Sequence, residues 1–168
     1  MDATSFIALA MACAPQVDIR TASALVAVES NHNPHAIGVV GGALQRQPQH
    51  RAEAIATAKS LHGEGWNFSI GLAQINVRNL HRLGLSLETA FDPCANLTAM
   101  QAVLRECFER AQTTNADTAS TDTQRTLRRA LSCYYSGNWV TGFEHGYVRR
   151  VAQAATRPFT STPTQEHQ

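Results

Sequence analysis

The chain has 168 residues, of which 43% are hydrophobic and 16% charged, and its formal net charge is +1. This length suits one domain with a buried core, and the near-neutral charge gives no general argument for binding nucleic acid or a membrane surface. Arginines are concentrated in the later part of the chain, which predicts a basic face exposed to solvent. The alternative is a patch that binds an anionic polymer. These arginines are Arg125, Arg128, Arg129, Arg149, Arg150 and Arg157.

An apolar run near the start, Ser5 to Cys13, predicts a first helix that packs into the core and ends at Ala14-Pro15. The run has no basic segment before it, and Asp2 is negatively charged where a signal peptide carries positive charge. It is also too short to span a bilayer. If the protein is exported, we expect its signal to have been removed or to lie outside these residues.

The next predicted helix carries a carboxylate on its apolar side. Asp18 is a suitable N-cap, and apolar residues recur after it at spacings of three and four, namely Ile19, Ala22, Leu25 and Val26. Glu29 continues this stripe, and Pro34 and the run Asn31-His32-Asn33 end the helix soon after it. Partial burial and the negative end of the helix dipole both raise a carboxyl pKa toward working pH. Glu29 is therefore a candidate general acid; the alternative is a glutamate at a frayed helix end that reaches water.

The residues after this helix combine a turn signal with another helix. Residues 36–40 and 43–46 flank Gly41-Gly42, which predicts a small hairpin. A helix is expected from about His50 to Leu61, ending at Gly63. The segment Trp66 to Asn76 then mixes glycine, aromatic, amide and aliphatic residues without a clean period. Such a segment either lines a cleft or forms a buried turn whose amides satisfy backbone groups.

Helices are also expected in the later half. Asp92 and Pro93 begin one that runs to about Ala111, and residues 113–123 read as an exposed polar loop. A further helix starts near Asp122 and stops at residues 136–138. A last helix has an apolar stripe of Val140, Phe143, Tyr147, Val151 and Ala154.

Four cysteines, Cys13, Cys94, Cys107 and Cys133, occur without a CxxC motif, so a zinc site is not expected. Cys94 and Cys107 lie in one predicted helix, separated by about 20 Å of rise, which is too far for a disulfide. Two full pairings stay open: 13–94 with 107–133, or 13–107 with 94–133. One bridge with two thiols, and four buried thiols, are the alternatives. The seven histidines do not form an HExxH motif, and we expect no metal site.

Three short segments together resemble a known family. They are Glu29-Ser30 before Asn33-Pro34, then Ser69-x-Gly71-Leu72-x-Gln74-Ile75, then Tyr134 before Ser136-Gly137. They occur in the order seen in lytic transglycosylases with the soluble lytic transglycosylase (SLT) fold. The resemblance covers about residues 5–155 and is closest to the VirB1-like branch, the peptidoglycan-cleaving component of type IV secretion systems. It includes Ile37-Gly-Val-Val-Gly-Gly, residues 65–76, Phe91-Asp-Pro-Cys-Ala-Asn-Leu and Ala130-Leu-Ser-Cys-Tyr.

The resemblance implies a fold and a set of site residues. The fold is all-α, mainly helical and lysozyme-like, with a small β-hairpin next to the active-site cleft, in a single SLT domain over residues 1–156 with a flexible tail at 157–168. Glu29 matches the catalytic acid/base. Four residues match the family's substrate-binding positions: Ser30, Ser69, Gln74 and Tyr134. In the family, the serine at position 30 helps hold the carboxylate or the substrate, and the amide at position 74 contacts the sugar near the scissile bond. The tyrosine at position 134 orients the catalytic site. The family usually has Asn where Tyr135 stands, and Met or Gly where Ala73 stands.

The implied reaction cleaves the β-1,4 bond between N-acetylmuramic acid and N-acetylglucosamine and closes a 1,6-anhydro ring, without metal or cofactor. The implied partners are the peptidoglycan glycan strand and type IV secretion components, with no nucleic acid and no membrane insertion, for a periplasmic monomer. Two alternatives remain. One is a hydrolytic lysozyme-type muramidase that uses a second carboxylate, such as Glu53, Glu64, Glu88 or Asp92. The other is a non-catalytic scaffold that binds cell wall or secretion-channel proteins.

Overall fold

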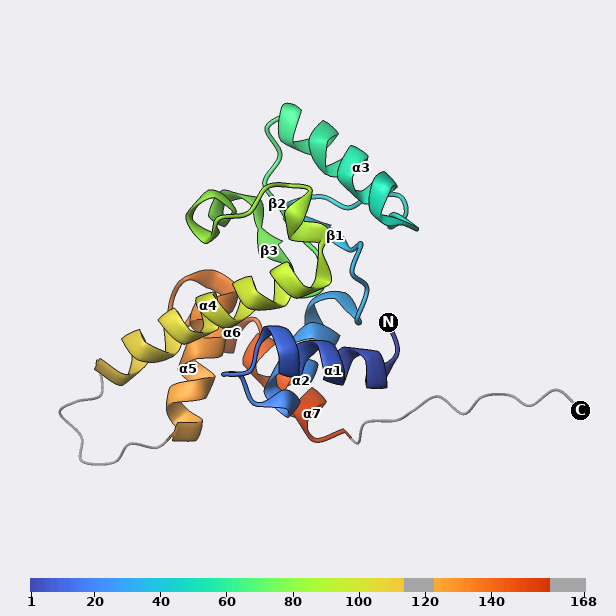
Figure 1. Cartoon of the computed structure of the whole chain (residues 1–168). Helices are drawn as coiled ribbons and strands as arrows, with labels where there is room; N and C mark the ends of the chain where they lie inside the picture. Colours follow the sequence, from blue (N-terminus) through green and yellow to red (C-terminus); the bar gives the residue numbers. More distant parts are fainter. Residues whose placement is uncertain (114–122, 158–168) are drawn as a thin grey trace, which may run out of the picture.

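The structure is a computed structural model that describes residues 1–113 and 123–157. These residues form seven α-helices and a three-stranded antiparallel sheet with the strand order β1-β2-β3 (Figure 1). The predicted helical fold with a small β element is therefore confirmed. The predicted polar loop at 113–123 and the tail at 157–168 lie almost entirely outside the described residues, so the domain boundary stays a prediction.

The elements follow one another along the chain with short connections. The helices are α1 (Ala3–Cys13), α2 (Ile19–Ser30), α3 (Arg51–Gly63), α4 (Pro93–Thr113), α5 (Thr123–Ser136), α6 (Thr141–Glu144) and α7 (Tyr147–Ala155). The strands are β1 (Ile37–Val39), β2 (Phe68–Ile70) and β3 (Ile75–Asn76). Three short 3₁₀ turns, η1 (Val77–Asn79), η2 (His81–Leu83) and η3 (Thr89–Phe91), connect the sheet to α4.

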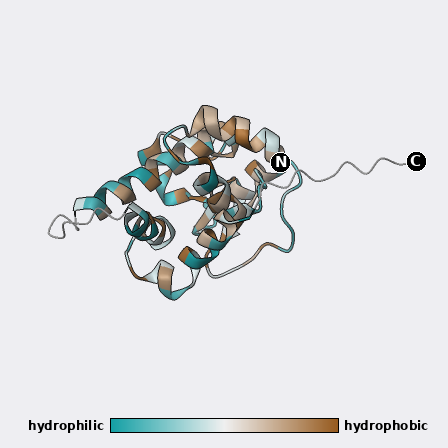
Figure 2. Cartoon of the chain, turned by 90° about the horizontal axis from the view of Figure 1, so that it is seen from below, coloured by the Kyte–Doolittle hydropathy of each residue, from teal (hydrophilic) through white to brown (hydrophobic). Residues whose placement is uncertain are grey.

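Helix α4 separates two groups of elements. In Figure 1 the sheet and α3 lie above α4, while α1, α2 and α7 lie below it. Helix α4 packs against α5 and α1, and α2 packs against α7. Figure 2 shows hydrophilic and hydrophobic residues alternating along the helices, as expected for helices that bury one side. The shared core includes the fully buried side chains of Phe6, Leu25, Leu97 and Met100.

The helix that carries Glu29 begins as predicted. The carboxylate of Asp18 accepts hydrogen bonds from the backbone N–H groups of Arg20 and Thr21, at 3.0 and 3.2 Å. The helix ends at Asn31, which has φ 51° in the left-handed region, a conformation that asparagine adopts more readily than most residues. Glu29 is thus fixed in the last turn of α2.

Two disulfides connect the helices and decide between the pairings that the sequence left open. Cys13 at the end of α1 is bonded to Cys94 at the start of α4, with 5.3 Å between their Cα atoms. Cys107 in α4 is bonded to Cys133 in α5, with 5.7 Å between Cα atoms. By the chain-entropy argument, each bridge stabilises the fold by about 4 kcal/mol.

The hairpin predicted around Gly41-Gly42 is wrong. Strand β1 pairs with β2, with Ile37 opposite Ile70, and residues 43–46 form no strand. The tight hairpin of this fold is β2–β3, in which Ser69 lies opposite Asn76.

The side chain of Gln47 explains why residues 43–46 do not pair with β1. Its Nε2 donates to the carbonyl oxygen of Ile37 at 2.9 Å, and its Oε1 accepts from the N–H of Ile37 at 2.8 Å. One side-chain amide thus satisfies the backbone groups that a neighbouring strand would otherwise bond at this residue.

The single last helix predicted from Val140 to Ala154 is also wrong. The chain forms a short α6, turns at Gly146 with φ 68°, and starts again as α7. Because of this break, Val140 and Phe143 are exposed rather than in the core, while Tyr147 and Val151 are buried.

Candidate active site

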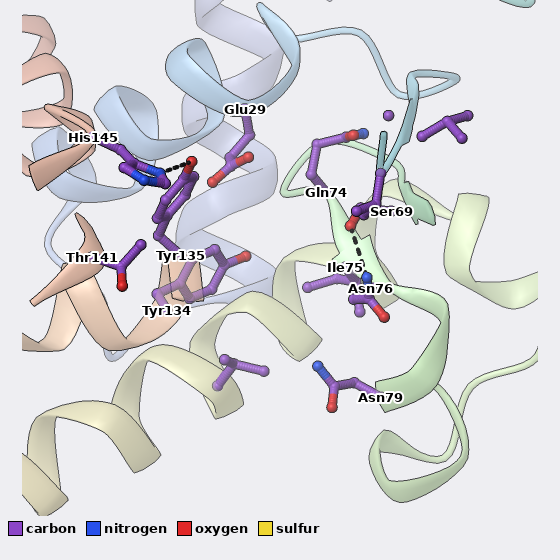
Figure 3. Close-up of a pocket in the computed structure, with 14 residues that line it drawn as sticks. Glu29, Ser69, Gln74, Ile75, Asn76, Asn79, Tyr134, Tyr135, Thr141 and His145 are labelled. Atoms are coloured by element: carbon purple, nitrogen blue, oxygen red, sulfur yellow. Dashed lines mark hydrogen bonds between the residues drawn. The ribbon is translucent and has the colours of Figure 1, made fainter. Parts of the chain in front are cut away.

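A cavity of about 470 Å³ lies between the helices and the sheet. Figure 3 shows Tyr134, Tyr135 and His145 on one side of it and Ser69 and Gln74 on the other, with Glu29 at the top between them. Its lining comes from α2, all three strands, α4, α5 and the α6 region. The structure thus brings Glu29, Ser69, Gln74 and Tyr134, which are far apart in the sequence, to one cavity.

The carboxylate of Glu29 is held by a tyrosine from another helix. The hydroxyl of Tyr147 donates to Oε1 of Glu29 at 2.6 Å. Burial raises the pKa of Glu29 to about 7, and the hydrogen bond from Tyr147 and the positive charge of Arg150 oppose that rise. A carboxyl group with this pKa exists in both protonation states near neutral pH, which is what a group that gives and later takes a proton needs.

Tyr147 was not singled out in the sequence, where it reads as one of the core residues of a helix. It is 1% exposed, and burial, ahead of the charge of Glu29, raises its pKa well above the ordinary value, so it stays a hydroxyl donor. One signal was available: a tyrosine on an otherwise apolar stripe must find a partner for its hydroxyl group once buried. The sequence does not say which partner.

Ser30 follows Glu29, but its hydroxyl bonds backbone carbonyl groups rather than the Glu29 carboxylate. Its hydroxyl donates to the carbonyl oxygen of Leu72 at 2.7 Å and, more weakly, to that of Val26 at 3.3 Å. Ser30 therefore ties the turn between β2 and β3 to the end of α2. This contact supports an indirect role in which Ser30 fixes the turn that carries Gln74.

Gln74 lies in that turn with φ 50° and lines the cavity. Its Nε2 donates to the carbonyl oxygens of Ala36 and Gly71, at 3.1 and 3.0 Å. A side chain at Gly38 would place its Cβ 2.6 Å from Oε1 of Gln74, so the amide needs glycine at this point of β1. The amide is thus both anchored to backbone and presented at the cavity wall.

The other wall is joined to the same turn by Tyr134. Its buried hydroxyl donates to the carbonyl oxygen of Ala73 at 2.7 Å. Asn96, which is 1% exposed, holds the turn from beneath: its Oδ1 accepts from the N–H of Ala73 at 2.8 Å, and its Nδ2 donates to the carbonyl oxygens of Ile70 and Ala90 at 3.1 and 2.8 Å. Asn96 was not recognised as part of the site from sequence.

Two further aromatic side chains line the cavity. The ring of Tyr135 stacks on that of Tyr147, with centroids 4.6 Å apart and planes at 19°. The hydroxyl of Tyr135 lies 3.2 Å from Nδ1 of His145 (Figure 3). Tyr135 is 40% exposed, so this residue presents aromatic surface to the cavity.

Ser69 lines the opposite wall and accepts a long hydrogen bond, 3.4 Å, from Nδ2 of Asn76.

Within the described residues, Glu29 is the only carboxylate that lines this cavity. The four carboxylates considered for hydrolysis are engaged elsewhere: Glu53 pairs with Arg46, Glu88 with Lys59, Glu64 accepts from Ser60 and Trp66, and Asp92 caps α4. The same part of the chain contains no group of three or more His, Cys, Asp or Glu placed to hold a metal ion. None of its helices is long and apolar enough to cross a membrane.

Comparison with known proteins identifies the class to which this fold and cavity belong. The profile described as "Transglycosylase SLT domain" matches residues 6–155, and the chain belongs to that family. Within the family it is similar to proteins named virB1, as the sequence motifs predicted. It is 45% identical over 166 residues to the "Type IV secretion system protein virB1" of Brucella abortus (strain 2308), a match that covers 94% of this chain and 68% of that protein. It is 34% identical over 161 residues to "Protein virB1" of Agrobacterium fabrum (strain C58), covering 93% and 62%. No solved structure matched the chain.

Proposed function

We propose that this chain is a lytic transglycosylase that cleaves the glycan strand of peptidoglycan, in the periplasm, for a type IV secretion system. Family membership and the similarity to proteins named virB1 support the class of enzyme and its setting. The observation that carries the chemistry is the placement of Glu29: a carboxyl group with a pKa of about 7, bonded to Tyr147, and the only carboxylate of its cavity among the described residues.

In the first step, protonated Glu29 donates its proton to the glycosidic oxygen between N-acetylmuramic acid and N-acetylglucosamine. The bond from that oxygen to C1 of the muramoyl sugar breaks, and N-acetylglucosamine leaves with a free 4-hydroxyl. The carbonyl oxygen of the muramoyl N-acetyl group stabilises the positive charge at C1. Substrate assistance of this kind replaces the second carboxylate that most glycosidases use.

In the second step, the Glu29 carboxylate accepts the proton of the muramoyl 6-hydroxyl as that oxygen attacks C1. A 1,6-anhydro ring closes, and Glu29 is protonated again. No water is consumed, so the masses of the two products add up to the mass of the strand. The hydrogen bond from Tyr147 stabilises the carboxylate between the two steps.

The remaining walls position the sugar. Gln74 and Ser69 line the side opposite Tyr135 and offer an amide and a hydroxyl to the sugar (Figure 3). We assign Tyr134 and Ser30 to indirect roles, because their hydroxyls bond the carbonyl oxygens of Ala73 and Leu72 in the turn next to Gln74.

The test is a digest of purified peptidoglycan by the wild-type protein and by Glu29→Gln, with the soluble fragments weighed by mass spectrometry. We expect fragments with 1,6-anhydro-muramoyl ends from the wild type and none from the variant. Fragments with reducing ends, one water heavier, would contradict the anhydro chemistry and identify a hydrolase. Absence of fragments from a wild-type protein shown to be folded would favour the scaffold alternative.

A further inference from the structure

The cavity at Glu29 continues into a second one. This second cavity, of about 500 Å³, shares six lining residues with the first: Val40, Asn76, Asn79, Val103, Tyr134 and Tyr135. From this shared wall it extends along η1, η2 and the facing sides of α4 and α5. A strand bound at Glu29 therefore has neighbouring room for groups attached to it.

The two cavities differ in charge. Arg78, Arg82 and Arg110 line the second cavity, together with one carboxylate, Glu106. No arginine lines the first one within the described residues. We call the second cavity the arginine pocket. Its excess of positive charge predicts an anionic occupant.

Glu106 is matched by one of the three arginines. Nη1 of Arg82 donates to both carboxylate oxygens of Glu106, at 3.1 and 2.9 Å, and Nε of Arg82 donates to Oδ1 of Asn79 at 3.1 Å. The guanidinium of Arg110 lies 5.3 Å from the ring centroid of Trp139. Arg82 is thus occupied by a protein carboxylate, and Arg78 supplies the unmatched positive charge.

Arg78 is the arginine best placed to bind a ligand. Across the ranges that the structure describes, its side chain makes no hydrogen bond or ion pair. Its backbone is fixed, because its N–H donates to Oδ1 of Asn76 at 3.0 Å, and Asn76 lines both cavities. An exposed guanidinium on a fixed backbone at a cavity wall is suited to two parallel hydrogen bonds to a carboxylate.

We infer that the arginine pocket binds free carboxylates of the peptide stems of peptidoglycan while the glycan lies at Glu29. This inference rests on the proposed function. The N-acetylated sugars of an intact strand are uncharged, so they give Arg78 no anionic partner, whereas the stems attached to them carry carboxylates. Because the two cavities share a wall, the occupant is a group on the bound strand rather than a separate molecule.

Binding to the non-cleaving Glu29→Gln protein tests this inference. Isothermal titration calorimetry would compare soluble glycan fragments that carry peptide stems with the same fragments stripped of stems by an amidase. The lactyl carboxylates that the amidase exposes would first be capped as methylamides, so that the stripped fragments carry no charge. We expect tighter binding of the stem-bearing fragments. Adding Arg78→Gln is expected to weaken their binding about fivefold, as for the loss of a partly exposed ion pair, and to leave the stripped fragments unaffected. Raising the salt concentration should mimic the substitution.

Arg20→Gln in the same background is the matched control, because Arg20 is an exposed arginine on α2 that lines neither cavity. Thermal unfolding followed by circular dichroism checks that both variants fold like the parent. Equal affinities for the two kinds of fragment, or an equal loss for both in Arg78→Gln, would overturn the inference. Failure of the folded parent to bind either fragment would instead contradict the proposed function.

Discussion

The hydroxyl of Tyr147 donates a 2.6 Å hydrogen bond to Oε1 of Glu29, a residue 118 positions earlier in the chain. The contact joins the first turn of α7 to the last turn of α2, two helices that pack on each other. Burial favours the neutral carboxyl, and this bond favours the carboxylate. The balance keeps a desolvated glutamate able to change protonation state near neutral pH.

Replacing Tyr147 with Phe is expected to raise the pKa of Glu29, because it removes a hydrogen bond that stabilises the charged form. Glu29 begins the proposed cycle protonated, so activity falls as the pH rises through its pKa of about 7. In Tyr147→Phe we expect this alkaline limb to move up by about one pH unit. The pH profile of kcat/KM on soluble glycan fragments measures the shift.

Tyr135→Phe is the control for that substitution, since the Tyr135 ring lines the same cavity and its hydroxyl bonds His145 rather than Glu29. It should leave the limb in place. A limb that stays or moves down in Tyr147→Phe would mean that the bond does not stabilise the carboxylate.

Glu29 should also make the fold less stable as the pH rises. Its pKa is raised in the folded state from 4.5 to about 7, so the folded protein binds its proton more tightly than the unfolded chain does. The resulting stabilisation is fully present below pH 4.5 and is lost as the pH rises to about 7. The full loss is on the order of 3 kcal/mol.

Urea unfolding at pH 5 and pH 8 measures this loss. The free energy of unfolding of the wild type should fall across this range relative to Glu29→Gln, which cannot titrate at this position. Comparing the two proteins cancels the carboxylates whose pKa is lowered, such as Glu53 and Glu88. Parallel changes in the two proteins would show that Glu29 has an ordinary pKa.

Asn96 should matter for stability more than its position in a helix suggests. Asn96→Ala removes three hydrogen bonds to buried backbone, those to Ile70, Ala73 and Ala90. We expect a loss of about 3 kcal/mol in the free energy of unfolding, measured by urea denaturation. Asn79→Ala, which removes one hydrogen bond to exposed Arg82, should cost under about 1 kcal/mol. Similar losses in both would refute a special role for Asn96.

Tyr134 should act through the turn that carries Gln74. Tyr134→Phe removes the hydroxyl that bonds Ala73 and keeps the ring, so kcat/KM should drop about tenfold while stability falls by only about 1 kcal/mol. The double variant Tyr134→Phe/Gln74→Ala should be no less active than Gln74→Ala alone. Multiplicative losses would mean that the two residues act independently.

The sequence predicted the position of Glu29 well, because local signals determine it. A capping aspartate, a three-and-four apolar spacing and a break at residues 31–34 fix where α2 begins, ends and faces. The roles of Ser30, Ser69, Gln74 and Tyr134 came from motifs and stay predictions, although the structure places Ser69, Gln74 and Tyr134 on the cavity wall.

The relationships that sequence reasoning missed depend on contacts between distant segments. Nothing local shows that Tyr147 reaches Glu29, since that requires the packing of α7 on α2. The hairpin was misplaced because a side chain, Gln47, satisfies the backbone of Ile37. A single last helix was predicted because the apolar spacing continues across the turn at Gly146.

The two disulfides also decide what a protease can release from the folded protein. Cys13–Cys94 and Cys107–Cys133 close two loops that do not overlap along the chain. A single backbone cut between residues 14 and 93, or between 108 and 132, therefore leaves both pieces covalently linked. Only a cut before Cys13, between Cys94 and Cys107, or after Cys133 sheds a fragment without a reducing agent. A nicked molecule can thus keep Glu29 and Tyr147 in one covalent unit.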